Sequence, residues 1–399
     1  MSWEYKTLDE LGTISRGKSK HRPRNDVSLF GGDYPFIQTA DVKAANLYLT
    51  EYEDTYNDKG LAQSKLWEAG TLCITIAANI ADTAILGMNA CFPDSIMGFQ
   101  PYEGISNVKF VKYAFDMLQR DCKQISQGAA QDNLSWKKLS TIEFPAPDIE
   151  IQDRIVNILS AYDDLIENNQ KQIKLLEEAA QRLYKEWFVD LRFPGYEDCK
   201  IVDGVPEGWK RKKISDLGEI VTGKTPSTSK EQYYGGDVPF VKIPDMHNCV
   251  YPITTETTLT VEGANTQKNK YISKNSIMVS CIATVGLVNI AVDDCQTNQQ
   301  INSIVLNNEE DLYFVYSSMK RLKALLEGVG SNGATMTNVN KTKFANLELL
   351  YPEDKIVKLY YDFCEPIFKK IYSLSLDKVE LSQMRDILLP KLMSGEIEI

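Results

Sequence analysis

The hydrophobic pattern is most regular between residues 149 and 190, where the chain has neither proline nor glycine. Apolar residues recur there every seven positions in one row, with a second row beside it. A seven-residue repeat sustained over about five helical turns predicts a long coiled-coil-like helix. About 37 residues at ~1.5 Å each would span on the order of 55 Å. Phe193-Pro194-Gly195 predicts where the helix ends. The first row is Leu159, Ile166, Ile173, Ala180 and Trp187, and the second is Ile155, Tyr162, Asn169, Leu176 and Leu183.

The same rows return near the C-terminus when every position is shifted by 201 residues. The identical register predicts that the two helices pack on each other, antiparallel if the chain has twofold symmetry. The alternative is that each helix packs only on its own domain. Asn169 is predicted to fix the helix register, and Pro366 predicts a kink or a helix start. The C-terminal rows are Tyr360, Ile367, Leu374, Leu381 and Leu388, and Ile356, Phe363, Lys370, Asp377 and Met384.

The helical repeat is part of a duplication of the whole chain. Gly17-Lys18 returns as Gly223-Lys224 at an offset of 206, and Gly31-Gly32-Asp33 returns as Gly235-Gly236-Asp237 at an offset of 204. This period is too long for a solenoid, whose repeats run ~20–50 residues. We therefore expect two copies of one globular-plus-helix unit, related by a pseudo-twofold axis. A target read by both copies would then have two halves.

Each copy begins with a globular region, residues 1–148 in the first and about 207–352 in the second. Residues 70–76 and 275–282 predict a matched pair of buried strands. Residues 110–124 and 313–327 predict helices. The predicted fold class is mixed α/β (α+β), with two similar globular domains separated by two long antiparallel helices.

Composition indicates where the protein is located and what its cysteines do. No apolar run approaches the ~18 residues of a membrane span, and no signal peptide is recognisable, so we expect a cytoplasmic protein. The eight cysteines never form a C-x-x-C pair, and the two histidines, His21 and His247, are far apart in sequence. This pattern disfavours a zinc site or a disulfide framework and predicts reduced, mostly buried thiols.

The net charge of −11 argues against simple nucleic-acid binding, but the cations are clustered. Residues 16–24 carry five Lys or Arg residues in nine positions. For the equivalent place in the second copy, the sequence offers Lys210-Arg211-Lys212-Lys213 and Lys224. Recurrence in both copies predicts a nucleic-acid contact. The alternative is a solvated surface loop in each copy.

Common catalytic motifs are missing from the sequence. It has no phosphate-binding glycine loop, no G-x-S-x-G elbow and no H-E-x-x-H zinc motif. It also lacks the glycine and Asn/Asp-Pro-Pro-aromatic motifs of a DNA adenine methyltransferase. Pro93-Asp94, Pro147-Asp148 and Pro244-Asp245 are not followed by the partner motif of a metal-dependent nuclease. We therefore expect a protein without catalytic activity of its own.

The order domain, helix, domain, helix resembles the specificity subunit of a type I restriction–modification enzyme. The resemblance covers essentially the whole chain. Its most specific part is the ending Arg385-Asp386-Ile387-Leu388-Leu389-Pro390-Lys391-Leu392-Met393-Ser394-Gly395-Glu396-Ile397. Other matches are Trp209 with Leu217-Gly218, Gly223-Lys224-Thr225-Pro226-Ser227, the Gly-Gly-Asp-x-Pro-Phe strand that leads to Asp41 or Asp245, and Pro145-Ala146-Pro147 before Gln152. The first copy departs from the second at Ala78-Asn79-Ile80-Ala81, where the second has Ala283-Thr284-Val285-Gly286.

The resemblance implies two target recognition domains, each reading one half of a split double-stranded DNA sequence. The implied ranges are residues 1–148 for the first domain, 149–192 for the central helix, 193–352 for a linker and the second domain, and 353–399 for the C-terminal helix. The helices would set the gap between half-sites and dock two modification subunits, through which restriction subunits join. S-adenosylmethionine, Mg²⁺ and ATP would belong to those partners.

Candidate DNA contacts combine lysines and arginines with polar residues that could contact bases. Divergence between residues 16–24 and 222–230 predicts two different half-sites. Two alternatives stay open: a bipartite DNA-recognition subunit of another defence or methylation system, and a coiled-coil scaffold without a DNA role. The candidate contacts are Lys18, Lys20, Arg22, Arg24, Gln38, Thr39 and Gln131 in the first copy, and Lys224 and Lys242 in the second.

Overall fold

The computed structural model describes residues 3–76, 82–125, 139–321 and 339–399. The chain forms two compact units. Unit 1 comprises residues 1–167 and 380–399, and unit 2 comprises residues 168–379. The division falls within both long helices, so each unit includes a segment of each helix. The sequence-based ranges, in contrast, kept each helix as a separate segment.

Unit 1 contains a five-stranded sheet of order β2-β10-β7-β8-β4, a four-stranded sheet of order β5-β3-β9-β6 and the pair β1-β11. Its elements, in chain order, are β1 (Glu4–Lys6), α1 (Leu8–Leu11), β2 (Gly12–Arg16), η1 (Val27–Leu29), β3 (Phe30–Phe36), α2 (Thr39–Ala44), β4 (Tyr48–Leu49), β5 (Asp54–Tyr56), α3 (Asp58–Ala62), β6 (Leu66–Trp67), β7 (Leu72–Thr75), β8 (Thr83–Leu86), β9 (Ala90–Cys91), β10 (Ile96–Pro101), α4 (Val108–Ile125), β11 (Phe144–Ala146) and the start of α6 (Ile149–Tyr184).

Unit 2 repeats this plan with sheets of order β15-β21-β18-β19 and β17-β16-β20 and the pair β14-β22, besides a small hairpin β12-β13. Its elements after α6 are η3 (Lys185–Val189), η4 (Tyr196–Asp198), β12 (Ile201–Val202), β13 (Val205–Pro206), β14 (Lys210–Lys213), α7 (Ile214–Leu217), β15 (Gly218–Thr222), η5 (Glu231–Tyr233), β16 (Tyr234–Val241), η6 (Ile243–Met246), β17 (Thr257–Leu259), α8 (Val261–Asn265), η7 (Lys268–Lys270), β18 (Ile277–Ser280), β19 (Val288–Ile290), β20 (Gln296–Thr297), β21 (Ile301–Leu306), η8 (Glu309–Asp311), α9 (Leu312–Met319), α11 (Lys341–Ala345), β22 (Glu348–Tyr351) and α12 (Asp354–Met393).

The shared strand order confirms the duplication inferred from the sequence. The predicted strands at 70–76 and 275–282 are β7 and β18, and every residue of both strands is buried. Each lies inside its sheet, paired on both sides. The helix predicted from residue 110 is α4. The helix predicted from residue 313 is α9, and the part of that prediction beyond residue 321 lies outside the described residues.

The long helices run antiparallel within each unit. In unit 1, the Arg154 guanidinium donates to the carbonyl of Ile399, and Asp163 pairs with Arg385. In unit 2, Lys378 donates to the side-chain oxygen of Gln170, and the Tyr360 hydroxyl donates to the carbonyl of Ala180. Residue numbers increase along α6 while those of their contact partners decrease toward and along α12, as antiparallel packing requires.

Only some residues of the predicted heptad rows are buried. Phe363 and Met384, both in the second C-terminal row, are 54% and 51% exposed, so that row turns away from the core after Ile356, which is buried. Each helix packs on its own unit's sheets and helices as well as on its partner, so its buried stripe is wider than a coiled-coil seam. Leu159, Ile166, Ile173, Trp187, Tyr360 and Leu374 are buried, whereas Leu176, Leu183, Ile367, Leu381 and Leu388 are partly buried.

Pro366 does not begin the second helix. Helix α12 starts at Asp354, twelve residues earlier, and continues through Pro366. A proline inside a helix removes one backbone donor and leaves the carbonyl four residues before it without a partner. Both Pro366 and Asp362 are exposed, so water can satisfy that carbonyl. Asn169, the proposed register residue, is buried at 8% exposure.

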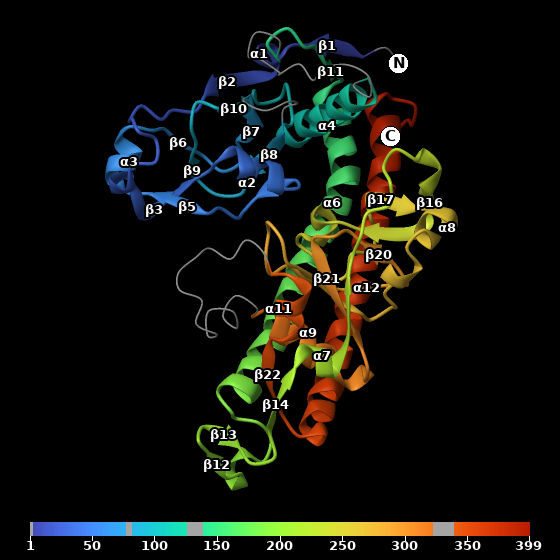
Figure 1. Cartoon of the computed structure of the whole chain (residues 1–399). Coiled ribbons are helices and arrows are strands. Elements are labelled where there is room, and N and C mark those ends of the chain that lie inside the picture. Colours follow the sequence, from blue (N-terminus) through green and yellow to red (C-terminus); the bar gives the residue numbers. More distant parts are fainter. Residues whose placement is uncertain (1–2, 77–81, 126–138, 322–338) are drawn as a thin grey trace. The chain divides into compact units, whose positions relative to one another are not determined.

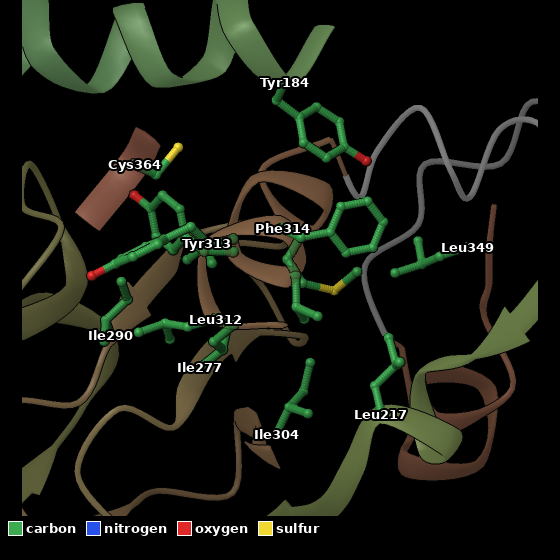
Figure 2. Close-up of a cluster of buried hydrophobic side chains, with 14 of the residues drawn as sticks. Tyr184, Leu217, Ile277, Ile290, Ile304, Leu312, Tyr313, Phe314, Leu349 and Cys364 are labelled. Carbon is green, nitrogen blue, oxygen red and sulfur yellow. The ribbon is translucent and has the colours of Figure 1, made fainter. Parts of the chain in front are cut away.

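Figure 2 shows how the helices complete the core of unit 2. Phe314 of α9 points toward Tyr184 of α6, with ring centroids 5.8 Å apart, and Cys364 enters from α12. Ile277 and Ile304 come from the neighbouring strands β18 and β21. Helix and sheet residues are therefore buried in one continuous core.

In unit 1, a buried ion pair stands where unit 2 has a tyrosine and a cysteine. Asp163 is 2% exposed, accepts from the Tyr113 hydroxyl and pairs with Arg385 at 2.5 Å. Burial lowers the pKa of Arg385, but Asp163 and Asp386 outweigh it and leave that pKa raised. At the shifted positions, unit 2 has Tyr184 and Cys364 in place of Arg385 and Asp163.

We expect Arg385→Ala to lower the free energy of unfolding by about 3 kcal/mol, because it leaves the Asp163 carboxylate buried without its cation. Lys391→Ala, which removes an exposed cation from the same helix, should change it by less than about 0.5 kcal/mol. Urea denaturation of both variants measures the difference. Equal midpoints for the two variants would contradict a stabilising role for this pair.

Candidate nucleic-acid interface

The same loop leaves the first strand of the main sheet in both units. The Gly17 N–H donates to Ile96 in unit 1, as Gly223 does to Ile301 in unit 2. A Cβ atom on Gly17 or Gly223 would overlap a backbone oxygen of the neighbouring loop, so neither position admits a larger residue. The lysine that follows each glycine therefore enters its loop from the same point.

The two candidate lysines after these glycines have matching backbone contacts. The Lys18 N–H donates to Phe92, and the Lys224 N–H donates to Thr297. Their carbonyls accept from Ser64 and Gln267 respectively. Lys18 is half-buried and Lys224 is exposed. Lys224 is therefore the structural equivalent of Lys18.

The remaining cations of the unit 1 loop differ in how firmly they are held. Lys20 is exposed, with its backbone N–H fixed by the side chain of Gln63. The Arg22 guanidinium donates to two carbonyls of its own loop, at 2.7 and 2.8 Å. Arg24 forms a half-exposed ion pair with Asp94 at 2.5 Å. The loop thus presents oriented cations at the surface.

Three candidate residues of unit 1 converge on one concavity of about 450 Å³. Arg24, Gln38 and Thr39 line it together with Asp54 and an apolar surface that includes Phe30 and Phe36. The rings of Phe30 and Phe36 meet edge to face, with centroids 5.8 Å apart. Polar groups therefore stand at the rim of an aromatic surface, a combination suited to contacting a base edge or a methyl group.

Asp41 holds the backbone at this rim. Its carboxylate accepts the Gln38 N–H at 2.7 Å and so caps helix α2. Partial burial raises the pKa of Asp41, while the same hydrogen bond acts in the opposite direction. In unit 2, Asp245 accepts the Lys242 N–H at 2.8 Å in the same way. Lys242 is thus the equivalent of Gln38. We call the two turns, Gln38–Asp41 in unit 1 and Lys242–Asp245 in unit 2, the rims.

Lys210–Lys213 does not occupy the equivalent of the cationic loop: it forms strand β14, which pairs with β22 as β1 pairs with β11. The prediction relied on the clustering of charge alone. The position of Lys210–Lys213 in the repeat corresponds to Glu4–Lys6, not to residues 16–24. Gln131 and the Ala78-Asn79-Ile80-Ala81 segment lie outside the described residues.

The described part of the chain offers no metal-binding group of three or more His, Cys, Asp or Glu side chains. The structure describes the side chains of seven of the eight cysteines, and all seven are free thiols. Burial raises the pKa of Cys249 and Cys281 to about 11, and that of Cys295 and Cys364 to about 12. These four thiols therefore stay protonated near neutral pH. Within the same described residues, no helix has the length and apolar character needed to cross a membrane.

Comparison with known proteins identifies the family. A family model described as "Type I restriction modification DNA specificity domain" matches residues 1–178 and again residues 206–380. The chain belongs to this family. It is a DNA-recognition subunit of the type I restriction–modification class, as the sequence resemblance implied. Each matched range takes in one copy of the duplicated sheets.

Individual relatives agree with the family match. The chain is 35% identical over 333 residues to the type I restriction enzyme HindI specificity subunit of Haemophilus influenzae, covering 68% of this chain and 72% of the relative. It is 25% identical over 414 residues to the MjaIX specificity subunit of Methanocaldococcus jannaschii, covering 100% and 94%. The crystal structure of a type I system S subunit from M. genitalium has the same fold, with a TM-score of 0.55 at 14% identity over 98% of this chain and 96% of that one.

Sequence reasoning missed the carboxylates that organise the two rims. Asp54 accepts from the Gln38 amide, and Glu256 pairs with Lys242. Asp54 is the first residue of β5, which is antiparallel to β3. Glu256 directly precedes β17, which is antiparallel to β16. They do not occupy equivalent positions, since Thr257 is the register equivalent of Asp54, so the repeat gave no signal for them. Only the strand register shows that they reach the rim.

We expect replacement of Lys20, Arg22 and Arg24 by alanine to weaken DNA binding by the assembled complex and to flatten its salt dependence. The slope of log K against log salt should fall by up to about 0.9 for each phosphate that the loop no longer neutralises. The matched control replaces Lys210, Arg211 and Lys213, three exposed cations on β14, and should leave the slope unchanged. Identical slopes for both triple variants would show that residues 16–24 form a solvated surface loop that does not contact DNA.

Proposed function

We propose that each unit of this specificity subunit reads one half of a split, asymmetric DNA target. The observation that carries the proposal is the pair of rims that follow β3 and β16. They share a backbone frame, fixed by Asp41 and Asp245, but present different side chains. A repeated frame with changed side chains is suited to reading two different half-sites in the same manner.

The net charge of −11 is compatible with this role if partner subunits supply most phosphate contacts. The local cations of residues 16–24 and Lys224 then place each rim against the DNA. Base-edge contacts would come from the polar residues of the rims. In this arrangement the phosphate contacts position the protein on the DNA, and the base contacts specify the sequence.

We further propose that the long helices dock two modification subunits, one on each unit, and that restriction subunits join through those. In support, the helix segments of each unit expose large apolar side chains, which are uncommon on a surface without a partner. They are Leu165, Met384 and Ile387 in unit 1, and Leu175, Val189 and Phe363 in unit 2, each at least 42% exposed.

In this proposal the chain itself performs no catalytic step. Methyl transfer with S-adenosylmethionine, and ATP- and Mg²⁺-dependent restriction, would take place in the partner subunits. Membership of a specificity-domain family supports this assignment. A bipartite recognition subunit of another defence or methylation system remains the second candidate. An adjacent gene for an adenine methyltransferase would favour the first candidate over it.

Exchange of residues 1–148 for those of a relative with another specificity should change one half of the methylated sequence only. The reason is that the sheets and rim of unit 1 come from this stretch, while those of unit 2 come from residues after it. Methylation-site sequencing of cells carrying the chimaera and its modification subunits gives the answer. A chimaera that altered both halves would show that the two readers are not independent.

Lengthening both helices should widen the gap between half-sites. We propose inserting four residues after Glu167 and four after Val379, which keeps the Asp163–Arg385 and Gln170–Lys378 contacts in register. Four residues add on the order of 6 Å, close to two base-pair steps of ~3.4 Å, with little more than one helical turn.

A single residue inserted at each place is the matched control, because it rotates each apolar stripe by about 100° and should destabilise the pair. Methylation-site sequencing and a thermal melt distinguish the two variants. If the four-residue variant assembled and methylated DNA at an unchanged gap, the helices would not set the spacing.

A further inference from the structure

Gln38 and Lys242 occupy the same place in the two units. Each is the residue at which the central strand of the smaller sheet gives way to a short helix, β3 to α2 and β16 to η6. The strands pair in matching register with an antiparallel neighbour, including the same bulge, and with a parallel neighbour. The two side chains therefore leave equivalent backbones.

Both backbones are fixed by an acceptor three residues ahead. The N–H of Gln38 is 2.7 Å from Asp41, and the N–H of Lys242 is 2.8 Å from Asp245. Asp245 also accepts the N–H of Glu256, which ties the following strand to the same point. A side chain on so constrained a backbone loses little further freedom when it contacts a ligand.

Both side chains are oriented by a carboxylate from the adjacent strand region. The Gln38 amide nitrogen lies 2.6 Å from Asp54, and the Lys242 ammonium nitrogen lies 3.2 Å from Glu256. The two carboxylates do not occupy equivalent positions, because the strand register places Thr257 opposite Phe240 where Asp54 lies opposite Phe36, and Glu256 is one residue earlier. Each unit nevertheless directs a carboxylate to this side chain, which is a neutral amide in unit 1 and a cation in unit 2.

The Asp54 contact fixes which groups of Gln38 remain available. A carboxylate only accepts, so the amide must turn its NH₂ group toward Asp54. One N–H is used there, which leaves a second N–H as donor and the amide oxygen as acceptor. One donor beside one acceptor is the pattern that matches N7 and the N6 amino group of adenine in the major groove.

Lys242 presents a different pattern from the same position. Its ammonium group has three N–H donors and no acceptor. One is directed to Glu256, and two remain. Two donors match the two acceptors of guanine, O6 and N7, and no other base pair offers two acceptors on one base in the major groove.

The space before Gln38 suits such a contact. Gln38 lines the concavity of about 450 Å³, whose surface also includes Thr39, Phe30 and the exposed Val27. In each contact one partner is exposed, Gln38 or Glu256, and the other, Asp54 or Lys242, is partly buried, so the contact contributes little to folding stability. A carboxylate contact in both units, made from different positions, is better explained by orientation of the reading side chain than by stability.

We propose that positions 38 and 242 are equivalent specificity-determining positions, at which Gln38 reads an adenine in one half-site and Lys242 reads a guanine in the other. This inference rests on the proposed function, because it requires that each unit reads one half-site. It adds the chemical identity of one base in each half.

The test exchanges the two reading side chains in the complete complex with its modification subunits and leaves both carboxylates in place. Gln38→Lys should change one base of one half-site from adenine to guanine. Lys242→Gln should make the reverse change in the other half. The preference at the affected base should shift on the order of tenfold to a hundredfold, the range of a good two-point base contact.

Ala44→Lys and Lys268→Gln are the controls, because they make the same charge changes at exposed residues of the same units, in α2 and η7. The readout is methylation-site sequencing, with selection from an oligonucleotide library randomised in both half-sites. The controls should leave every base preference unchanged. If a control shifted the same base as an exchange did, charge rather than donor pattern would be responsible, and the inference would fail.

Gln38→Ala and Lys242→Ala cover the case in which an exchanged complex does not assemble. Each should relax discrimination at a single base of one half-site. Assembled variants with unchanged preferences, or with changes at bases other than adenine and guanine, would overturn the base assignment while half-site reading stood. A wild-type complex without sequence-specific methylation would instead refute the proposed function itself.

Discussion

The cores of both units are completed by the two long helices, and the rest of the structure depends on this packing. In unit 1, Leu159 of α6 and Leu389 of α12 belong to the same buried cluster as Phe115 of α4. In unit 2, Tyr184 and Tyr360 are buried with Phe314. Neither unit could exclude water from its sheets without these helical residues, since hydrophobic burial is the main force that favours folding. Helices and recognition regions therefore form as one structure within each unit.

This shared packing gives the recognition rims a fixed base. The strands that lead to Gln38 and Lys242 are held by neighbours on both sides, and aspartates close the turns that follow. Variation is confined to side chains and loops that project from this frame. A duplicated frame can thus change what it recognises without changing its core, as is usual where binding residues lie on loops of a rigid scaffold. The contrast between Asp163–Arg385 in unit 1 and the aromatic cluster in unit 2 shows that the helix contacts also diverged.

Much of the architecture could be predicted because it depends on periodicity. The buried strands β7 and β18 and the long helices follow from apolar spacing, and the doubled strand order follows from the internal repeat. The errors came where periodicity is ambiguous. Phe363 and Met384 fit a seven-residue row but are exposed, because a helix that packs on a globular core follows its true 3.6-residue turn. Pro366 does not begin a helix, because the carbonyl that it leaves without a partner lies in exposed surroundings.

The sequence by itself determined the duplication, the mixed α/β class, the paired helices and the family, since each is encoded in spacing or motif order along the chain. It also pointed to Gln38 and Lys242 as candidates. The repeat offset of 204 also relates these two residues, but only the tertiary structure decided that each is oriented by a carboxylate, Asp54 or Glu256. The physical reason is that these contacts join separate strands. Their existence depends on strand register and on the turn that each aspartate closes, and neither is written in the local sequence.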